Sequence, residues 1–554
     1  MALAWRILAL NTAAFTVCFA VWMMYGVLVT FLVDRGLYAW TREEMGWLIG
    51  VPVLTGSLLR LPVGVLADRY GGRLVFALLM LGAALPTWSV SLADSFWQFL
   101  LAGLGFGLCG TSFAVGVAYT AAWFPPTRQG TALGIFGIGN IGAALTSMGA
   151  PLLLNHLTGG GADLEGWRGL PRLYAAALVL TSLVFWVLTE TRRVESRPGL
   201  AERLAPLRDL RVWRFGLYYF FAFGGFVALS QWLIPYYVNM YGLPLASAGF
   251  LVGIFSLPAG GVRALGGWLA DRMGARSVMY GALGSGLLLL VLLFPPRMEI
   301  QTPGPGITAA RAGVVSRVSE REIAVGADRY PLREGRGSPR LPLTAPEGQK
   351  EGQLFLPVAS FRQEPVVKAG EGVAKGQLLA RGVTHIYFQA NLGVFTSLVF
   401  LLGIALGCTS AAVYKHIPHY FPANVGVVGG LVGVLGGLGG FVDPIVFGYL
   451  LQATGLWTTC WMYLFLVGLG SLLWMHLVIQ HMMHQQVPAL MREIEAHPTV
   501  LCPRYGSAAR IRLRVESCSL WEGEGPPECG APCLRVSPDG SAREAGKGAA
   551  QSQT

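Results

Sequence analysis

Twelve stretches of the chain are each about 20 residues long and mostly apolar, which is the length that an α-helix needs to cross the hydrocarbon core of a membrane. They lie at 8–33, 44–66, 74–92, 96–124, 130–154, 173–188, 215–238, 247–269, 277–294, 386–406, 425–451 and 459–478. The composition agrees, since 53% of the 554 residues are hydrophobic and only 13% are charged, against about 25% in an ordinary soluble domain. The sequence therefore predicts an all-α membrane protein. It disfavours a soluble enzyme, a disordered chain and a nucleic-acid binder.

Arginines gather on one side of these spans. The loop between the sixth and seventh spans carries seven of them, and the turns after the second and eighth spans carry two more each. By the positive-inside rule these segments face the cytoplasm, which also places both termini there. We expect a multi-pass protein of a bacterial or archaeal plasma membrane.

The spans divide the chain into two halves. We predict an N-terminal six-helix bundle at 1–190, a cytoplasmic linker at 191–214, and a C-terminal six-helix bundle made of 215–294 and 385–480. A polar insert rich in Pro and Gly, at 295–384, interrupts the second bundle and falls outside the cytoplasm. The polar tail at 481–554 is expected to be disordered.

Part of the insert, 364–382, reads EPVVKAGEGVAKGQLLARG, and its alternating valines and glycine turns fit short strands. It resembles half of a biotinyl/lipoyl-like barrel-sandwich fold. None of its lysines has the hairpin context that carries such a group, so we expect no cofactor. Two interpretations stay open. One is a small β decoration, favoured because surface insertions cost little; the other is an extracytoplasmic docking module for a protein partner.

The tail contains four cysteines, which could bind zinc through four thiolates. They are Cys502, Cys518, Cys529 and Cys533. Their spacing is irregular and forms no paired C-x2-C knuckles, which favours incidental cysteines. We expect no metal site.

One turn motif occurs twice, at matching span ends. Residues 60–73 read RLPVGVLADRYGGR and residues 263–276 read RALGGWLADRMGAR, so both copies follow R-x3-G-x-LADR-x-G-x-R, 203 positions apart. A second pair of motifs, Phe-Pro before a glycine run, begins at Phe124 and Phe421, 297 positions apart. The extra 94 positions are about the length of the insert. The chain is therefore a parallel repeat of six spans, a plan that places a transporter's substrate site near the midplane between the halves.

The LADR-x-G-x-R turn resembles the cytoplasmic signature of the major facilitator superfamily. The resemblance implies that its charged residues latch neighbouring helices and control alternating access. They are Asp68, Arg69, Arg73, Asp271, Arg272 and Arg276. The other interpretation is a polar turn that only supplies cytoplasmic positive charge, but the internal repeat favours gating.

Arg60 and Arg263 open the two copies, eight residues before the Asp of each, which is about two helical turns inside the membrane. An arginine at that depth costs about 2.5–3.5 kcal/mol on insertion scales and marks a functional position. No acidic residue occurs at comparable depth in the first ten spans, so two facing cations need an anionic ligand to offset their repulsion. Guanidinium groups suit planar oxyanions. We interpret the pair as an anion site; the alternative is a structural pairing with a buried carboxylate.

Glycines recur at helical spacing in the fifth and eleventh spans. Such spacing puts small residues on one helix face and lets helices approach closely. The glycines are Gly130, Gly134, Gly137, Gly139 and Gly142 in the first set, and Gly430, Gly433, Gly436, Gly437, Gly439 and Gly440 in the second. Alone they indicate packing and say little about a substrate.

The segments around these glycines narrow the resemblance from the major facilitator superfamily to one family within it. GTALGIFGIGNIG (130–142) and VGGLVGVLGGLGGF (428–441) are similar to the paired nitrate signatures of the nitrate/nitrite porter family, and AAVYKHIPHYFP (411–422) also resembles that family. The resemblance covers nearly all twelve spans. It implies a major facilitator fold and the transport of nitrate and nitrite by alternating access, in nitrate assimilation or respiration.

The resemblance also implies a set of substrate-binding residues. In that family two midplane arginines clamp the anion, and they match Arg60 and Arg263. An Asn of the first signature contacts the anion and matches Asn140. The pocket is lined by aromatic residues that match Tyr219 and Phe223 of the seventh span, within YFFAFGGF, and Phe113 of the fourth, within a G-x-x-F pattern. The aromatic residues could equally serve bundle packing, and the signature glycines are expected to let helices pack and rock.

Asp443 lies inside the eleventh span, two residues after the second signature, where an apolar residue is expected. Carboxylates inside membranes often mark proton paths, so one interpretation is a proton-coupling group. Its depth favours the other, a satisfied carboxyl near the outer mouth. The coupling mode stays open between nitrate/nitrite exchange and proton-linked nitrate symport.

Two rival functions also stay open. One is a major facilitator carrier of another small anion, such as an organic acid, and the other is a non-transporting anion sensor that signals through the insert or the tail. The sequence contains no paired catalytic carboxylates, nucleophile elbow, metal motif or phosphate loop. We therefore expect no enzyme.

Overall fold

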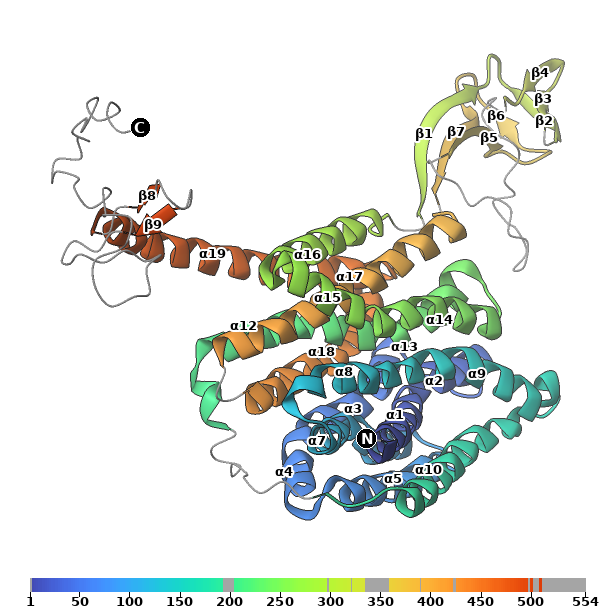
Figure 1. Ribbon diagram of the computed structural model, residues 1–554. Helices are drawn as coiled ribbons and strands as arrows, with labels where there is room; N and C mark the ends of the chain where they lie inside the picture. The colour runs from blue at the N-terminus through green and yellow to red at the C-terminus, as the bar shows by residue number, and fades with distance from the viewer. Residues whose placement is uncertain are drawn as a thin grey trace, which may run out of the picture. The chain divides into compact units, whose positions relative to one another are not determined.

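The computed structural model describes residues 2–192, 204–295, 298–319, 321–333, 358–388, 390–421, 425–496, 499–501 and 508–510 (Figure 1). Within these ranges ten helices are long and apolar enough to cross a membrane, and two bent helix pairs raise the number to twelve if each pair is one span. The remaining regular structure is a small set of β-strands. The predicted all-α membrane fold with a β insert is confirmed.

Several spans of the first half are broken into two helices by a short irregular turn. The helices are α1 (Ala2–Trp22), α2 (Met24–Asp34), α3 (Arg42–Leu58), α4 (Arg60–Tyr70), α5 (Gly72–Ser89), α6 (Phe96–Phe106), α7 (Ser112–Trp123), α8 (Pro126–Gly137), α9 (Gly142–Leu157) and α10 (Gly169–Leu188). A 3₁₀ segment, Gly107–Thr111, joins α6 to α7, and another, Ile138–Ile141, joins α8 to α9. These tighter turns fall in the middle of their spans, where such distortions often accompany functional sites.

The second half has the same order of spans. Its helices are α12 (Leu210–Tyr219), α13 (Gly225–Tyr241), α14 (Leu245–Gly261), α15 (Arg263–Met273), α16 (Ala275–Leu292), α17 (Leu392–Tyr420), α18 (Val425–Thr454) and α19 (Thr459–Ala496). A single π-helical turn, Phe220–Gly224, joins α12 to α13.

Both motif arginines stand at a bend in their span. α3 and α4 meet at 41° on either side of Leu59, so Arg60 is the first residue after the bend. α14 and α15 meet at 42°, and Arg263 opens α15 in the same way. The internal repeat read from the sequence therefore extends to the local backbone, because each copy breaks its helix directly before the arginine.

The glycines of the LADR-x-G-x-R turn are required by the backbone. α4 ends at Gly71 with φ of 91°, and α15 ends at Gly274 with φ of 87°. An L-residue with a side chain rarely adopts these angles, whereas glycine does so readily. The second helix of each pair thus ends at the same residue of the motif in both halves.

The two halves meet along α3 and α18. A Cβ atom placed on Gly46 would lie 2.5 Å from the carbonyl oxygen of Pro444, and one on Gly50 would lie 2.6 Å from that of Phe441. Side chains at these positions would force the helices apart, so the glycines of α3 permit backbone contact with α18. A second line of contact joins α9 to α14.

The insert is built from two small sheets. The first has the strand order β1 (Met298–Thr308), β7 (Leu378–Phe388), β5 (Val358–Pro365), and the second has the order β4 (Asp328–Pro331), β3 (Glu322–Val325), β2 (Gly313–Val318), β6 (Gly372–Val373). All neighbouring strands are antiparallel. They share a core of Ala309, Val315, Ile323, Val325, Val367, Val373, Leu379 and Ala380. The insert therefore has its own hydrophobic core.

The predicted start of the tenth span at 386 is wrong. Ile386 belongs to β7 and pairs with Ile300 of β1 and Ala359 of β5. α17 begins only at Leu392, where the side chain of Asn391 accepts hydrogen bonds from the first amides of the helix. The end of β7, 386–388, resembles the start of an apolar span because its Ile, Tyr and Phe occur in both patterns.

The prediction of a disordered tail is wrong for its first residues. α19 continues from Thr459 to Ala496, and a hairpin of β8 (Thr499–Leu501) and β9 (Ala508–Arg510) follows. Leu473–Thr554 forms a compact unit separate from Met1–Leu472. The four cysteines of the tail lie outside the described residues, so the zinc hypothesis stays a prediction.

Candidate anion-binding site

Arg60 is held by backbone carbonyls of both halves. Its side chain is buried, with 5% exposed. Nε donates a hydrogen bond to the carbonyl oxygen of Gly110 at 3.2 Å, and Nη1 donates one to that of Gly433 at 2.8 Å. Gly110 belongs to the 3₁₀ segment of the first half and Gly433 to α18 of the second. Arg60 therefore spans the boundary between the halves.

Arg263 is held less completely. Its Nε and Nη2 are buried, and neither has a hydrogen-bond acceptor among the residues that the structure describes. A buried guanidinium nitrogen without an acceptor is costly. These two donors form one edge of the guanidinium fork, the geometry that binds a planar oxyanion.

Phe223 links the two cations. The Cζ atom of Arg60 lies 5.5 Å from the centre of the Phe223 ring, and that of Arg263 lies 5.1 Å from the same centre. The separation of the two guanidinium carbons can therefore not exceed the sum of these distances. Phe223 stands in the π-helical turn Phe220–Gly224, a distortion that often occurs at functional sites.

Other aromatic rings surround the two arginines and Phe223. Tyr219 stacks on Phe223 with ring centres 5.1 Å apart, and Tyr414 of α17 meets Tyr219 edge-on at 5.0 Å. On the other side, the Cζ atom of Arg60 lies 5.8 Å from the ring of Phe113 and 5.7 Å from that of Trp22. The structure thus brings Arg60, Arg263, Tyr219, Phe223 and Phe113 together, five of the six residues predicted to bind substrate.

The sixth, Asn140, stands in the 3₁₀ segment Ile138–Ile141 of the first half and is buried. Its amide nitrogen donates to the carbonyl oxygen of Gly137 at 2.7 Å, while Oδ1 is buried without a donor among the described residues. A Cβ atom on Gly260 would lie 3.5 Å from the Cβ atom of Asn140. Gly260 precedes Arg263 by three positions, so Asn140 packs against α14 about one helical turn before Arg263.

The glycines of α18 shape this pocket. Gly436 gives room to the ring of Tyr219, Gly437 to Ser57, and Gly439 to the turn at Gly224. Gly433 offers its carbonyl to Arg60, a role that side-chain motifs do not reveal. In the first half, Gly139 gives room to Phe15, whereas Cβ atoms on Gly134 and Gly137 would have no described neighbour within 4 Å.

Sequence reasoning missed several members of the site. They are Trp22, Ser57, Gly110, Tyr414 and Phe226, whose ring centre lies 6.0 Å from the Cζ atom of Arg263. A signal existed for Tyr414, because it belongs to the segment 411–422 that resembles the family. Trp22 and Ser57 lie in apolar runs that nothing in the sequence distinguishes from packing.

The charged turns make contacts inside their own halves. In the second half Asp271 forms an ion pair with Lys415, and Arg276 donates to the hydroxyl of Tyr420 at 3.1 Å. In the first half Arg73 donates through Nε to the carbonyl oxygen of Trp186 at 3.0 Å. Arg69 and Arg272 lie over the rings of Tyr70 and Trp268. Control of access by these turns stays a prediction.

The halves also touch at the end of the helices where the loop 35–41 lies, which we call the Arg42 end. Nη2 of Arg42 donates to the side-chain oxygen of Asn239 at 3.2 Å, and its Cζ atom lies 5.3 Å from the Trp457 ring. Trp47 donates to the hydroxyl of Tyr449 at 3.4 Å. The contact of Trp47 joins α3 to α18, and those of Arg42 join α3 to α13 and to the loop between α18 and α19.

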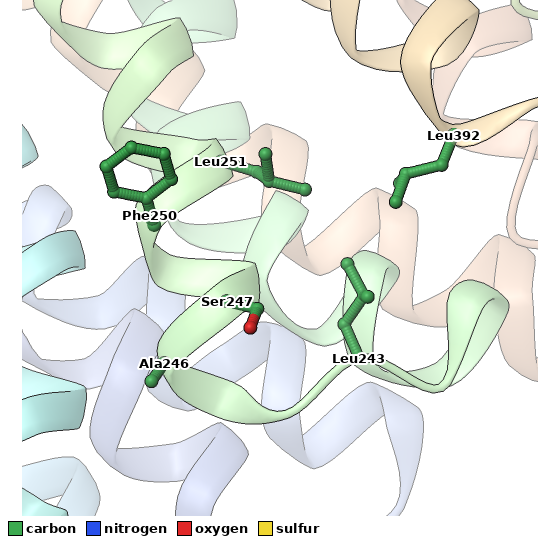
Figure 2. A pocket seen from close by; sticks show the side chains of 6 residues that line it. All are labelled: Leu243, Ala246, Ser247, Phe250, Leu251 and Leu392. Carbon is green, nitrogen blue, oxygen red and sulfur yellow. The ribbon is translucent and has the colours of Figure 1, made fainter. Parts of the chain in front are cut away.

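A separate cavity of about 420 Å³ lies next to the N-terminal ends of α14 and α17 (Figure 2). It is lined by Leu243, Ala246, Ser247, Phe250, Leu251 and Leu392. This lining contains no cationic side chain and one hydroxyl. The cavity therefore offers nothing to an anion, and the arginine pair remains the site of interest.

A helical membrane protein with two repeated halves, a buried Arg60 and a half-buried Arg263 with two buried donors between them has the architecture of a secondary transporter. The family model of the Major Facilitator Superfamily matches residues 10–307, more than half of the chain. A bacterial homologue of the lysosomal transporter Spinster shares the fold, with a TM-score of 0.53 at 15% identity over 86% of this chain and 95% of that one.

Relatives narrow the family further. The chain is 39% identical over 499 residues to a probable nitrate/nitrite antiporter, NarK1, of Thermus thermophilus, covering 88% of this chain and 95% of that protein. It is 25% identical over 474 residues to the nitrite extrusion protein of Bacillus subtilis, covering 85% and 94%. The chain belongs to the nitrate/nitrite porter family of the major facilitator superfamily.

Proposed function

We propose that this protein carries nitrate and nitrite across the plasma membrane by alternating access, with the anion held between Arg60 and Arg263. The observation that carries the proposal is the state of Arg263, whose Nε and Nη2 are buried and lack acceptors among the described residues. Two cations that lie against one aromatic ring, one of them buried, repel each other, and a small anion between them offsets that repulsion.

The aromatic residues around the two arginines favour a small, planar anion. Phe223, Phe113 and Trp22 exclude water from the guanidinium groups, which strengthens every electrostatic contact made there. Three coplanar oxygens can accept from two guanidinium forks at once. The names of the relatives from T. thermophilus and B. subtilis support nitrate and nitrite as the anions.

The orientation follows from the arginine-rich linker, which we place in the cytoplasm with both termini. The Arg42 end then faces outward, and so does the insert, where a protein partner outside the cytoplasm could reach it. With this orientation, we propose that the contacts of Arg42 and Trp47 belong to a state that is closed toward the outside.

The test is nitrate uptake into proteoliposomes under two conditions. One batch is loaded with nitrite at equal pH, and the other is nitrite-free with an inward proton gradient. Uptake that nitrite competes for, and that formate and oxalate leave unchanged, is the expected result. Absence of nitrate uptake in both batches, or stronger competition by formate or oxalate, would overturn the choice of substrate.

A further inference from the structure

Asp443 is a buried carboxyl group that the anion site does not use. It stands inside α18, and its side chain is 0% exposed. Oδ1 accepts a hydrogen bond from the hydroxyl of Tyr463 in α19 at 3.1 Å. Oδ2 has no donor among the described residues.

Several basic side chains of the elements packed against α18 contact groups other than Asp443. Arg42 of α3 contacts Asn239 and Trp457, and Arg60 of α4 donates to Gly110 and Gly433. Lys415 of α17 pairs with Asp271, while Arg214 of α12 and His416 of α17 lie beside Phe215 and Tyr420. Among described residues, no ion pair reaches Asp443, and Tyr463 is the titratable group that touches it.

A carboxylate in this position would be an uncompensated charge with one hydrogen bond. Burying such a charge costs considerably more than burying a neutral carboxyl with the same partner. The closed arrangement therefore favours the protonated form of Asp443. The proton can leave only when water reaches the group.

Asp443 also lies beside the part of α18 that approaches α3 most closely among the contacts described above. The carbonyl oxygens of its neighbours Phe441 and Pro444 press against Gly50 and Gly46 of α3, in the other half. Pro444 has no amide hydrogen, so α18 lacks one helical hydrogen bond next to Asp443. Separation of α3 from α18 at the Arg42 end would admit water to this region.

The same helix connects Asp443 to the anion site. Gly433, ten residues earlier and about 15 Å along the helix axis, accepts the hydrogen bond of Arg60. Tyr463 is half-buried and stands in the second turn of α19, near the Arg42 end. Tyr463 therefore stands closer to the Arg42 end of its helix than Asp443 does in α18.

We propose that Asp443, with Tyr463 as its hydrogen-bond partner, is the proton-binding site of a proton-linked anion symport. The proton binds when the outer side is open, and travels with the anion in the closed and inward-facing states. The inference rests on the proposed function, because it names the ion that accompanies the anion.

The experiment compares wild type with Asp443→Asn, which resembles the protonated form in shape, in proteoliposomes that contain a pH-sensitive dye. An acid exterior should drive nitrate accumulation and acidify the interior in wild type. Asp443→Asn should lose both signals by at least ten-fold, while nitrate/nitrite counterflow at equal pH persists. Asp94→Asn, an exposed acid at the same end, is the matched control and should keep both signals.

If Asp443→Asn moved as many protons per nitrate as wild type, that result would overturn the proposal. So would a wild type that exchanges nitrate for nitrite without moving protons, a result that leaves the proposed function intact. A wild type that moves no nitrate at all refutes the proposed function instead. If Asp443→Asn does not fold, Tyr463→Phe decides. Its loss of a donor to the carboxylate should shift the pH profile of uptake upward, and an unchanged profile would overturn the proposal.

Discussion

Nη1 of Arg60 donates a hydrogen bond to the carbonyl oxygen of Gly433 at 2.8 Å, from one half of the molecule to the other. Arg263 occupies the same position of the repeated motif, yet its Nε and Nη2 lack acceptors among the described residues. The two arginines are therefore not equivalent. Arg60 is anchored to the backbone of both halves, and Arg263 keeps the free donors that an anion would use.

The first prediction concerns Arg263→Lys. The change keeps the charge but removes the planar fork, so nitrate uptake below saturation should fall by about 30-fold, equivalent to about 2 kcal/mol. Insertion and thermal stability should stay normal. Arg60→Lys should lose uptake and also melt at a lower temperature, because it gives up the contacts with Gly110 and Gly433. Initial uptake rates and melting curves of purified protein test both, and wild-type uptake by both variants would contradict the clamp.

The second prediction concerns the ring between the cations. Phe223→Leu should raise the KM for nitrate about five-fold or more, since a cation–π contact contributes about 0.5–2 kcal/mol and two guanidinium groups lie near this ring. Phe221→Leu is the control, because Phe221 stands in the same turn but packs beside Gly468 of α19. Concentration series of uptake measure the difference. Equal KM values for the two variants would show that Phe223 serves packing only.

The positions of the site arginines could be read from the sequence because the constraint is local. Membrane depth makes Arg60 and Arg263 costly, and the repeat places them at equal distances from Asp68 and Asp271. The spans were predictable for the same reason, since apolar length alone identifies them. The inclusion of Phe223 and Tyr219 depended on family resemblance, because buried aromatic residues are common in any bundle.

What could not be predicted depends on contacts between distant segments. The acceptor for Arg60 is a backbone carbonyl, at Gly433, which carries no sequence signal. The bend before each arginine and the π-helical turn at Phe223 are tertiary adjustments of otherwise regular helices. The strand at Ile386 was misread because its partners, Ile300 and Ala359, lie far away in the chain.

The third prediction tests the glycines of α18. Gly436→Ala would push a methyl group into the ring of Tyr219, and overpacking of this kind costs about 1–3 kcal/mol. We expect a lower melting temperature and weaker nitrate binding together. Gly281→Ala in α16 is the control, since its Cβ atom would have no described neighbour within 4 Å. Similar behaviour of the two variants would argue against a role for Gly436 in shaping the pocket.

The fourth prediction concerns the insert. Met298 and Phe388 are paired across β1 and β7, so a short flexible linker can replace the residues between them without straining α16 or α17. Because the insert has its own core, its removal should leave nitrate uptake within about two-fold of wild type, as expected for changes that remove no contact of the site. Uptake by the shortened protein tests this, and loss of transport with normal insertion would assign the insert a direct role.

The fifth prediction concerns the seam between α3 and α18. A leucine at Gly46 would collide with the backbone at Pro444, so Gly46→Leu should prevent closure at the Arg42 end while leaving Arg60 and Arg263 untouched. Nitrate should still quench the fluorescence of Trp22, whose ring lies 5.7 Å from the Cζ atom of Arg60, but nitrate/nitrite exchange should slow at least ten-fold because one of the two alternating states is lost. Gly281→Leu, in α16, should exchange normally. Wild-type exchange by Gly46→Leu would mean that the α3–α18 contact is not part of the transport cycle.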